Sequence, residues 1–283
     1  MNNEHRLIVA GVSSLDSRLA MVRWAADEAA ARSAELVLVT AVPPRADPEQ
    51  YLPSDAADRL RDTARTRLAQ AAELAAASRP GLRISTEVIS ARPVDALLQA
   101  ATRADVLVVG ADDQSPFAEA IAGSVPGTLL TTAPCPLVVV PQAEPVVPDT
   151  APVFVALDEH GFSKSALAYG FAAADRSARR LHILRCVPAG THKQADVADR
   201  ARSLIAFGQL YPDVEVTQET AVGDPRDVLA DRSRASALLV LGSRGHGRLA
   251  STLFGSVSRD LIRRSGCPVV VARPRSAELE GVV

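Results

Sequence analysis

Glycines and a hydroxyl lie in a pattern that could bind phosphate. Gly242 and Gly245 are separated by two residues, and after nine more residues Gly255 and Ser256 follow. The apolar run Ala237-Leu-Leu-Val-Leu241 ahead of them predicts a strand buried on both faces. We expect Gly255 and Ser256 to open the next helix, where backbone N–H groups and a hydroxyl form a natural phosphate site. A flexible glycine-rich turn is the alternative that the glycines alone leave open.

Other polar groups are expected to gather around this loop. Asp158 comes just after the first predicted strand of the same half, and Cys186 and Val187 end the second strand. Neighbouring strands of an open parallel sheet end at one crevice, where such folds bind ligands. There the Asp158 carboxylate could accept hydrogen bonds from a ribose or an adenine amino group, or it could cap a helix. Within the loop, Gly247 adds a further glycine and Arg244 adds positive charge.

The chain contains two copies of one pattern. A shift of 132 residues places Leu107-Val-Val-Gly110 on Leu239-Val-Leu-Gly242, and it places Gly123-Ser-Val125 on Gly255-Ser-Val257. Near the start of each half the shift becomes 145. This is a tandem duplication in a chain of 283 residues, and each half has the size of an ordinary domain. We expect domains at 1–141 and 153–275, joined by a proline-rich linker at 142–152.

Each half reads as strands alternating with helices. In the first half we expect strands at 7–12, 36–42, 83–89, 105–110 and 136–140, and helices near 15–32, 54–79, 93–103 and 120–132. In the second half we expect strands near 153–157, 181–187, 214–220, 237–242 and 268–272. Alternation of this kind requires crossover connections and a parallel sheet. The predicted fold class is α/β, with two tandem, doubly wound, Rossmann-like domains.

Several other chemistries lack their residues. The chain has no GxxxxGK[ST] loop, no GxGxxG after a first strand and no GxSxG elbow, and its histidines lack metal-ligand spacing. We therefore predict no catalytic residue and no metal ligand. The net charge of −2 gives no argument for nucleic acid or an anionic membrane. No signal peptide, membrane span or close cysteine pair is visible, so we expect a cytoplasmic protein.

Taken together, these motifs resemble those of the ATP-binding universal stress proteins over nearly the whole chain. The glycine pattern, Asp158 after a valine-rich strand, and the closing Ser265-Gly-Cys-Pro-Val-Val-Val271 carry the resemblance. It implies a five-stranded parallel sheet in each domain, of the adenine nucleotide alpha hydrolase-like type, and binding of ATP, with or without Mg²⁺, or of a related adenine nucleotide. It also implies that the two halves form an intramolecular pseudo-dimer, and it leaves a homodimer of chains open.

The resemblance also assigns roles to residues. It gives the phosphates to the loop and the helix start, the nucleoside to Asp158, and adenine to the backbone near Cys186 and Val187. The phosphate-binding residues are Gly242, Gly245, Gly255, Ser256, Val257 and Ser258.

The first half departs from the pattern where phosphate would bind. Asp113 stands in the place of Gly245, and residues 111–122 contain three acids and no base, whereas 243–254 contain two arginines and no acid. Two like charges about 4 Å apart cost about 4 kcal/mol at an effective dielectric constant near 20. Ser13 also takes the place of Asp158. We therefore expect the first domain to be a degenerate copy that binds no nucleotide.

Three functions fit these observations. The favoured one is a nucleotide-dependent regulator in stress adaptation, with ATP in the second domain. An enzyme of similar architecture, such as a slow ATP hydrolase or an adenylyl-transfer enzyme, is the alternative. A non-binding dimerisation or scaffold protein with a vestigial glycine loop is the third.

Overall fold

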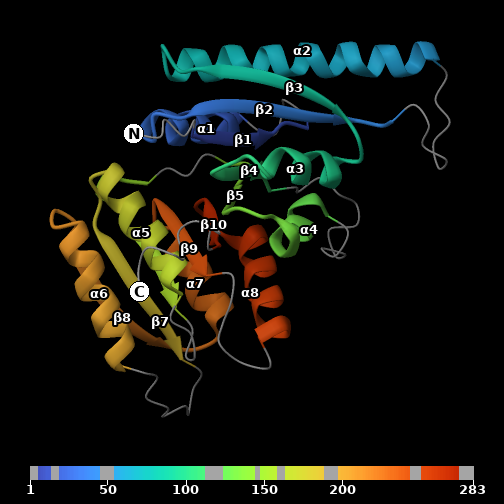
Figure 1. Ribbon diagram of the computed structural model, residues 1–283. Helices are drawn as coiled ribbons and strands as arrows, with labels where there is room; N and C mark the ends of the chain where they lie inside the picture. Colours follow the sequence, from blue (N-terminus) through green and yellow to red (C-terminus); the bar gives the residue numbers. More distant parts are fainter. Residues whose placement is uncertain are drawn as a thin grey trace. The chain divides into compact units, whose positions relative to one another are not determined.

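The computed structural model describes residues 6–13, 19–44, 54–111, 124–143, 147–157, 163–187, 197–242 and 250–273. The chain divides into two compact units, Met1–Ala143 and Glu144–Val283. Each unit is an α/β structure built on a parallel sheet (Figure 1).

The first unit alternates strands and helices along its described residues. Its elements are β1 (Leu7–Gly11), α1 (Leu19–Ala31), β2 (Glu35–Val42), α2 (Ser54–Ser78), β3 (Ile84–Ser90), α3 (Pro93–Ala101), β4 (Val106–Gly110), α4 (Val125–Thr132) and β5 (Leu137–Val140). The strands lie in the order β3-β2-β1-β4-β5, and each neighbouring pair is parallel. Helix α1 packs against α2, and α3 packs against α4.

The second unit repeats this plan. Its elements are β6 (Val153–Leu157), α5 (Lys164–Arg176), β7 (Leu181–Val187), α6 (Val197–Leu210), β8 (Val216–Val222), α7 (Pro225–Ser233), β9 (Leu238–Gly242), α8 (Ala250–Arg264) and β10 (Val269–Ala272). The strands lie in the order β10-β9-β6-β7-β8, again all parallel. Because β6 lies between β7 and β9, the loops that follow these three strands start from neighbouring points.

Small and branched apolar side chains build the two cores. Every residue of β4 and of β9 is buried, as expected for strands covered on both faces. On α5, Gly170 allows a close approach to β6, since a Cβ atom there would lie 2.2 Å from Val155 Cγ2. The other face of this sheet packs against α7 and α8 through a cluster that includes Leu184, Leu229 and Leu261. The low aromatic content thus reflects helices that lie close to a valine-rich and leucine-rich sheet.

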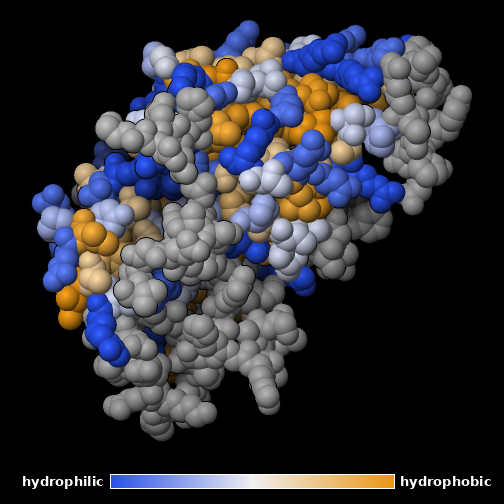
Figure 2. Space-filling model, in the orientation of Figure 1, coloured by the Kyte–Doolittle hydropathy of each residue, from blue (hydrophilic) through white to orange (hydrophobic). Residues whose placement is uncertain are grey.

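Helix α6 packs on α5 with part of its surface and leaves two large apolar side chains exposed. Its Phe207 stacks on Phe171 of α5, with ring centroids 5.4 Å apart. On the same helix, Ile205 is 62% exposed and Leu210 is 66% exposed. Figure 2 shows the corresponding hydrophobic surface over α6. No described residue covers these two side chains.

The segment that joins the two units is bound to the second one. Arg179 Nη1 donates hydrogen bonds to the carbonyl oxygens of Pro148, Asp149 and Ala151, at 3.1, 2.6 and 2.9 Å. Part of the proline-rich linker predicted at 142–152 is therefore held in place by an arginine that follows α5.

The predicted strands correspond to observed strands in both halves. The largest shift is in the third strand of the second half, which is Val216–Val222 where the sequence predicted 214–220. The four predicted helices of the first half are also present, although residues 14–18 and 112–123 lie outside the described residues.

Candidate functional site

The carboxyl ends of β6, β7 and β9 meet at one edge of the second sheet. Leu157 at the end of β6 pairs with Arg185 of β7, and Ala156 pairs with Leu241 of β9. Gly242 at the end of β9 pairs with Ala272 of β10. This register brings together the three strand ends from which the sequence predicts ligand contacts. Asp158, Arg244, Gly245 and Gly247 belong to this edge by sequence and lie outside the described residues.

Gly242 contacts the start of α5. A Cβ atom at Gly242 would lie 2.3 Å from Ser163 Oγ and 2.4 Å from Ser163 Cβ, which no real packing allows. Ser163 is the N-cap of α5, and its Oγ accepts a hydrogen bond from Ala166 N at 3.3 Å. The glycine therefore lets a helix N-terminus, with its partial positive charge, lie against the end of β9. The sequence analysis did not identify Ser163. A serine directly ahead of an apolar helical run is nevertheless a common N-cap signal.

Cys186 and Val187 lie at the end of β7, with both side chains buried. The Cys186 thiol belongs to the core cluster beneath α7 and α8. Burial, followed by the nearby Glu219 carboxylate, raises the pKa of Cys186 to about 11, so the thiol stays protonated at neutral pH. The Val187 carbonyl accepts a hydrogen bond from Gly223 N at 3.0 Å. Within the described residues, the pairing of β7 with β6 ends at Arg185, so Cys186 and Val187 can offer backbone groups to a ligand at this edge. Their side chains are buried and cannot.

Gly255 and Ser256 do not open a helix, so this prediction is wrong. Helix α8 begins at Ala250 and includes both residues in its interior. In the first unit, by contrast, α4 begins at Val125 and Ser124 is its N-cap, with Oγ accepting a hydrogen bond from Gly127 N at 3.1 Å. A proline explains the difference.

Pro126 lies in the first turn of α4, where its missing N–H costs nothing, and it could not lie deeper in a helix. The matching residue of the second half is Ser258. Serine imposes no such limit, so α8 extends several residues further toward the loop.

The hydroxyl of Ser258 is buried and has no partner among the described residues. Ser258 is 4% exposed, and its Oγ makes no hydrogen bond within the described part of the chain. Buried hydroxyls are nearly always satisfied, and an unsatisfied one costs about 1–3 kcal/mol. Its neighbour Val257 packs on the apolar cluster and so turns its side chain to the core. The adjacent Arg259, which the sequence reading did not single out, also buries an Nε atom that is unpaired within the described residues.

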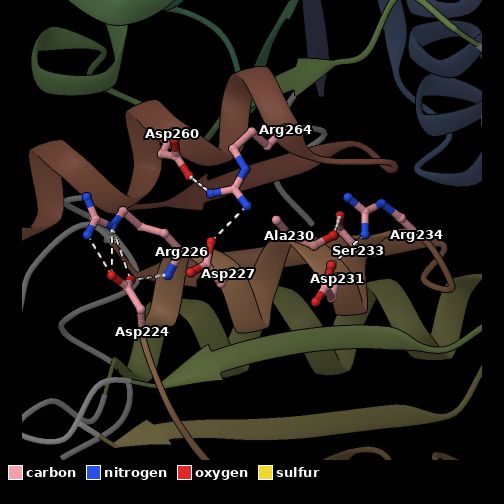
Figure 3. Close-up of polar contacts among 9 residues, drawn as sticks. All are labelled: Asp224, Arg226, Asp227, Ala230, Asp231, Ser233, Arg234, Asp260 and Arg264. Atoms are coloured by element: carbon pink, nitrogen blue, oxygen red, sulfur yellow. Dashed lines mark hydrogen bonds and ion pairs between the residues drawn. The ribbon is translucent and has the colours of Figure 1, made fainter.

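Charged residues tie α8 to α7 (Figure 3). The Arg264 guanidinium lies between two carboxylates, with Nη2 at 2.8 Å from Asp227 Oδ1 and Nη1 at 2.9 Å from Asp260 Oδ2. At the start of α7, Asp224 caps the helix and pairs with Arg226. Hydrogen bonds from the Arg226 side chain and then from Arg226 N lower the pKa of Asp224 to about 2.

A buried hydroxyl links α7 to the turn after α8. Ser233 Oγ donates to Ala230 O at 2.6 Å and accepts from Gly266 N at 2.9 Å. The helix that carries Ser258 is thus held by the neighbouring helix at its carboxyl-terminal half. The sequence Asp-Pro-Arg-Asp at 224–227 is a recognisable helix start, and it contains three of the charged residues of this network.

The matching edge of the first unit is only partly described. Gly110 ends β4, and Ser13 follows β1 as an exposed residue. Thr40 Oγ1 donates to Val12 O at 2.6 Å and so fixes the end of β1 to β2. Asp112, Asp113 and Glu119 lie outside the described residues.

Three further observations concern the described part of the chain. Among the described residues, no group of three His, Cys, Asp or Glu side chains could hold a metal ion. Cys135, Cys186 and Cys267 are buried, and none of them forms a disulfide bond. No described helix is both long and apolar enough to cross a membrane.

Comparison with known proteins gives a consistent result. The model of the "Universal stress protein family" matches residues 4–141 and 151–273. Universal stress protein Rv2623 of Mycobacterium tuberculosis is 30% identical, over 94% of this chain and 96% of its own length. Universal stress protein Rv2005c of the same organism is 29% identical, over 95% of this chain and 97% of its own. The crystal structure of a universal stress protein from Archaeoglobus fulgidus is similar in fold, with a TM-score of 0.73 and 20% identity over 96% of this chain and 97% of its own.

Proposed function

The chain belongs to the universal stress protein family, and from this premise we propose that its second unit binds ATP and acts as a nucleotide-dependent regulator in stress adaptation. The proposed site is the edge of the sheet where β6, β7 and β9 end. The first unit, in this proposal, is a degenerate copy that holds no nucleotide.

The observation that carries the proposal is the buried hydroxyl of Ser258, which has no hydrogen-bond partner among the described residues. It belongs to the Gly255-Ser-Val-Ser258 end of the glycine motif, where a phosphate is expected. The hydroxyl would donate a hydrogen bond to a phosphate oxygen, which would offset the cost of burying it without a partner. Hydrogen bonds to charged acceptors contribute about 1.5–3 kcal/mol, more than neutral ones do.

The remaining contacts follow from the positions of the strand ends. Gly242, Gly245 and Gly247 would let the backbone approach the phosphates, and Arg244 would supply a countercharge. The start of α5, which lies against Gly242, adds its partial positive charge at the same end of the sheet. Asp158 would accept a hydrogen bond from the nucleoside, and the backbone at Cys186 and Val187 would face adenine. The proposal holds for ATP with or without Mg²⁺.

The position of Gly255 and Ser256 inside α8 adds a condition. Backbone N–H groups in a helix interior already donate to carbonyls one turn earlier and are not free to bind an anion. Direct backbone contact to phosphate would therefore require α8 to begin later in the bound state, near the point at which α4 begins in the first unit. Such a change at the loop would give nucleotide occupancy a structural effect that a partner protein could recognise.

Native mass spectrometry of freshly purified full-length chain tests the proposal most directly. We expect a mass increase that corresponds to one adenine nucleotide per chain. Calorimetric titration of nucleotide-free protein with ATP should give a stoichiometry of one. A stoichiometry of two would contradict the degenerate first unit, and no saturable binding would contradict the function. Chromatography of the bound nucleotide over time separates a regulator, which retains ATP, from a slow hydrolase, which accumulates ADP.

A further inference from the structure

The first unit has a cavity, open to solvent, at the amino ends of β1, β2 and β3. It measures about 360 Å³, which is within the range of small-molecule sites. Leu7 and Val37 form an apolar wall, and Glu35, Ser85, Glu87 and Arg103 bring polar groups. The lining therefore has two carboxylates against one guanidinium.

Hydrogen bonds hold these polar groups in place. Ser85 Oγ donates to Glu35 Oε1 at 2.6 Å, and Arg103 forms an ion pair with Glu87. No other hydrogen bond of the Glu35 carboxylate occurs within the described residues. The cavity is thus built from ordered side chains on β2, β3 and the turn after α3.

The second unit fills the corresponding place with one of its own side chains. Val37 pairs with Ser85 in the first sheet, and His182 pairs with Thr217 at the same register of the second sheet. The His182 ring bridges two groups, with Nδ1 at 2.8 Å from Thr217 Oγ1 and Nε2 at 3.2 Å from Glu219 Oε2.

Part of the polar frame around that ring has a counterpart in the first unit. Thr217 corresponds to Ser85 and Glu219 corresponds to Glu87, by the 132-residue shift of the repeat. Arg232 forms an ion pair with Glu219, as Arg103 does with Glu87. A hydroxyl, a carboxylate and a guanidinium on that carboxylate are therefore present in both units, although the two arginines come from different positions of the repeat. The first unit differs in two ways: Val37 replaces the imidazole, and Glu35, whose counterpart is Arg180, adds a carboxylate.

We propose that the first-unit cavity binds a small imidazole-type nitrogen heterocycle in its cationic form. One ring N–H would donate to the Glu87 carboxylate and the other nitrogen would contact Ser85 Oγ, as His182 contacts Glu219 and Thr217. Leu7 and Val37 would pack against the ring, and the excess of one negative charge in the lining favours the protonated ligand. The proposal does not rest on nucleotide binding, because every residue that carries it belongs to the first unit and the proposed nucleotide site belongs to the second.

The probe is 4-methylimidazole, which is the side chain of histidine as a free molecule. We would titrate it into ¹⁵N-labelled full-length protein at about pH 6, where most imidazole is protonated. Backbone amide shifts of Val37, Ser85 and Glu87 should move and saturate. Val37→His should weaken binding at least tenfold, because the new ring would take the place that His182 takes in the second unit, whereas Val37→Ala should retain it.

A pair of matched variants separates the site from general effects of charge. Glu87→Gln should weaken binding about tenfold, and Glu219→Gln, the same change at the occupied position of the second unit, should leave it unchanged. This pair decides the outcome even if Val37→His fails to fold. The absence of saturation in the unmodified protein, or equal affinity in Glu87→Gln and Glu219→Gln, would overturn the proposal.

Discussion

Gly242 and Ser163 occupy space that cannot hold one more carbon atom, since a Cβ at Gly242 would lie 2.3 Å from Ser163 Oγ. The end of β9 and the start of α5 are therefore fitted to each other at the point where the glycine loop begins. Packing within the second unit is therefore sufficient to require glycine at position 242, whether or not a ligand also approaches it.

Exchange of Gly242 for alanine should destabilise the protein through this contact. Overpacking of a well-filled site costs about 1–3 kcal/mol, so Gly242→Ala should lower the free energy of unfolding by that amount. Ser163→Gly should cost only a few tenths of a kcal/mol, because glycine is a tolerated N-cap. In denaturant unfolding, the double variant should be more stable than the sum of the two single changes predicts. Strict additivity would show that the contact is not strained.

Gly245→Asp should abolish ATP binding without unfolding the chain. The change copies Asp113 from the first half, where a folded domain tolerates it, and it places a carboxylate next to the expected phosphates. Calorimetry should show no saturable binding, and circular dichroism should be unchanged. The reciprocal variant Asp113→Gly serves as the control and should keep a stoichiometry of one. Unaltered ATP affinity in Gly245→Asp would remove this loop from the phosphate site.

Ser258→Ala should separate ligand binding from stability. Because the hydroxyl makes no hydrogen bond in the described residues, its removal should leave the stability of the free protein unchanged or raise it by up to about 1 kcal/mol. ATP affinity should fall at least tenfold. Ser233→Ala is a matched control, since that buried hydroxyl has two hydrogen bonds, and it should cost about 1–3 kcal/mol of stability while ATP affinity is retained. A large loss of stability in Ser258→Ala would mean that the hydroxyl is already satisfied.

Asp224 should titrate at unusually low pH. Its pKa of about 2 in the folded protein lies below the unfolded value, so its contribution to stability is present above about pH 4 and is lost as pH falls toward 2. The pair with Arg226 is half exposed, which limits the contribution to about 1 kcal/mol at most. Carbon-detected NMR titration of the carboxylate should give a midpoint near 2, and Arg226→Gln should raise it. Asp224→Asn, which keeps a cap, should lose stability at pH 7, and its difference from the parent should shrink as the pH falls toward 2 and vanish below it.

Hydrogen exchange should reveal a change at the start of α8. If ATP binds the backbone of Gly255 and Ser256, the helix must unwind ahead of them. Peptides covering 250–254 should then exchange faster with ATP, and those covering 256–260 should exchange more slowly. The corresponding part of the first unit, around α4, should not respond. Protection of 250–254 by ATP would instead mean that the nucleotide contacts α8 through side chains alone.

Local patterns were enough to predict most of the fold. Short valine-rich and leucine-rich runs such as 106–110 and 238–242 indicate strands that are buried on both faces. The helices between successive strands indicate that the strands pair in parallel. The duplication was visible because the same strand and loop residues recur. These features depend on the chemistry of neighbouring residues, and therefore the sequence alone determined the order of elements and the family.

The details of the site depended on residues that are distant in the chain. One detail was local and was missed: α8 extends back to Ala250, which Ser258 allows and which Pro126 at the matching position of α4 disfavours. The fit of Gly242 to Ser163, and the cavity that Val37 leaves where His182 fills its counterpart, arise only when strands and helices pack. Periodicity and turn signals describe one segment at a time. Steric fit and buried hydrogen bonding are properties of several segments together, and only the tertiary structure decided them.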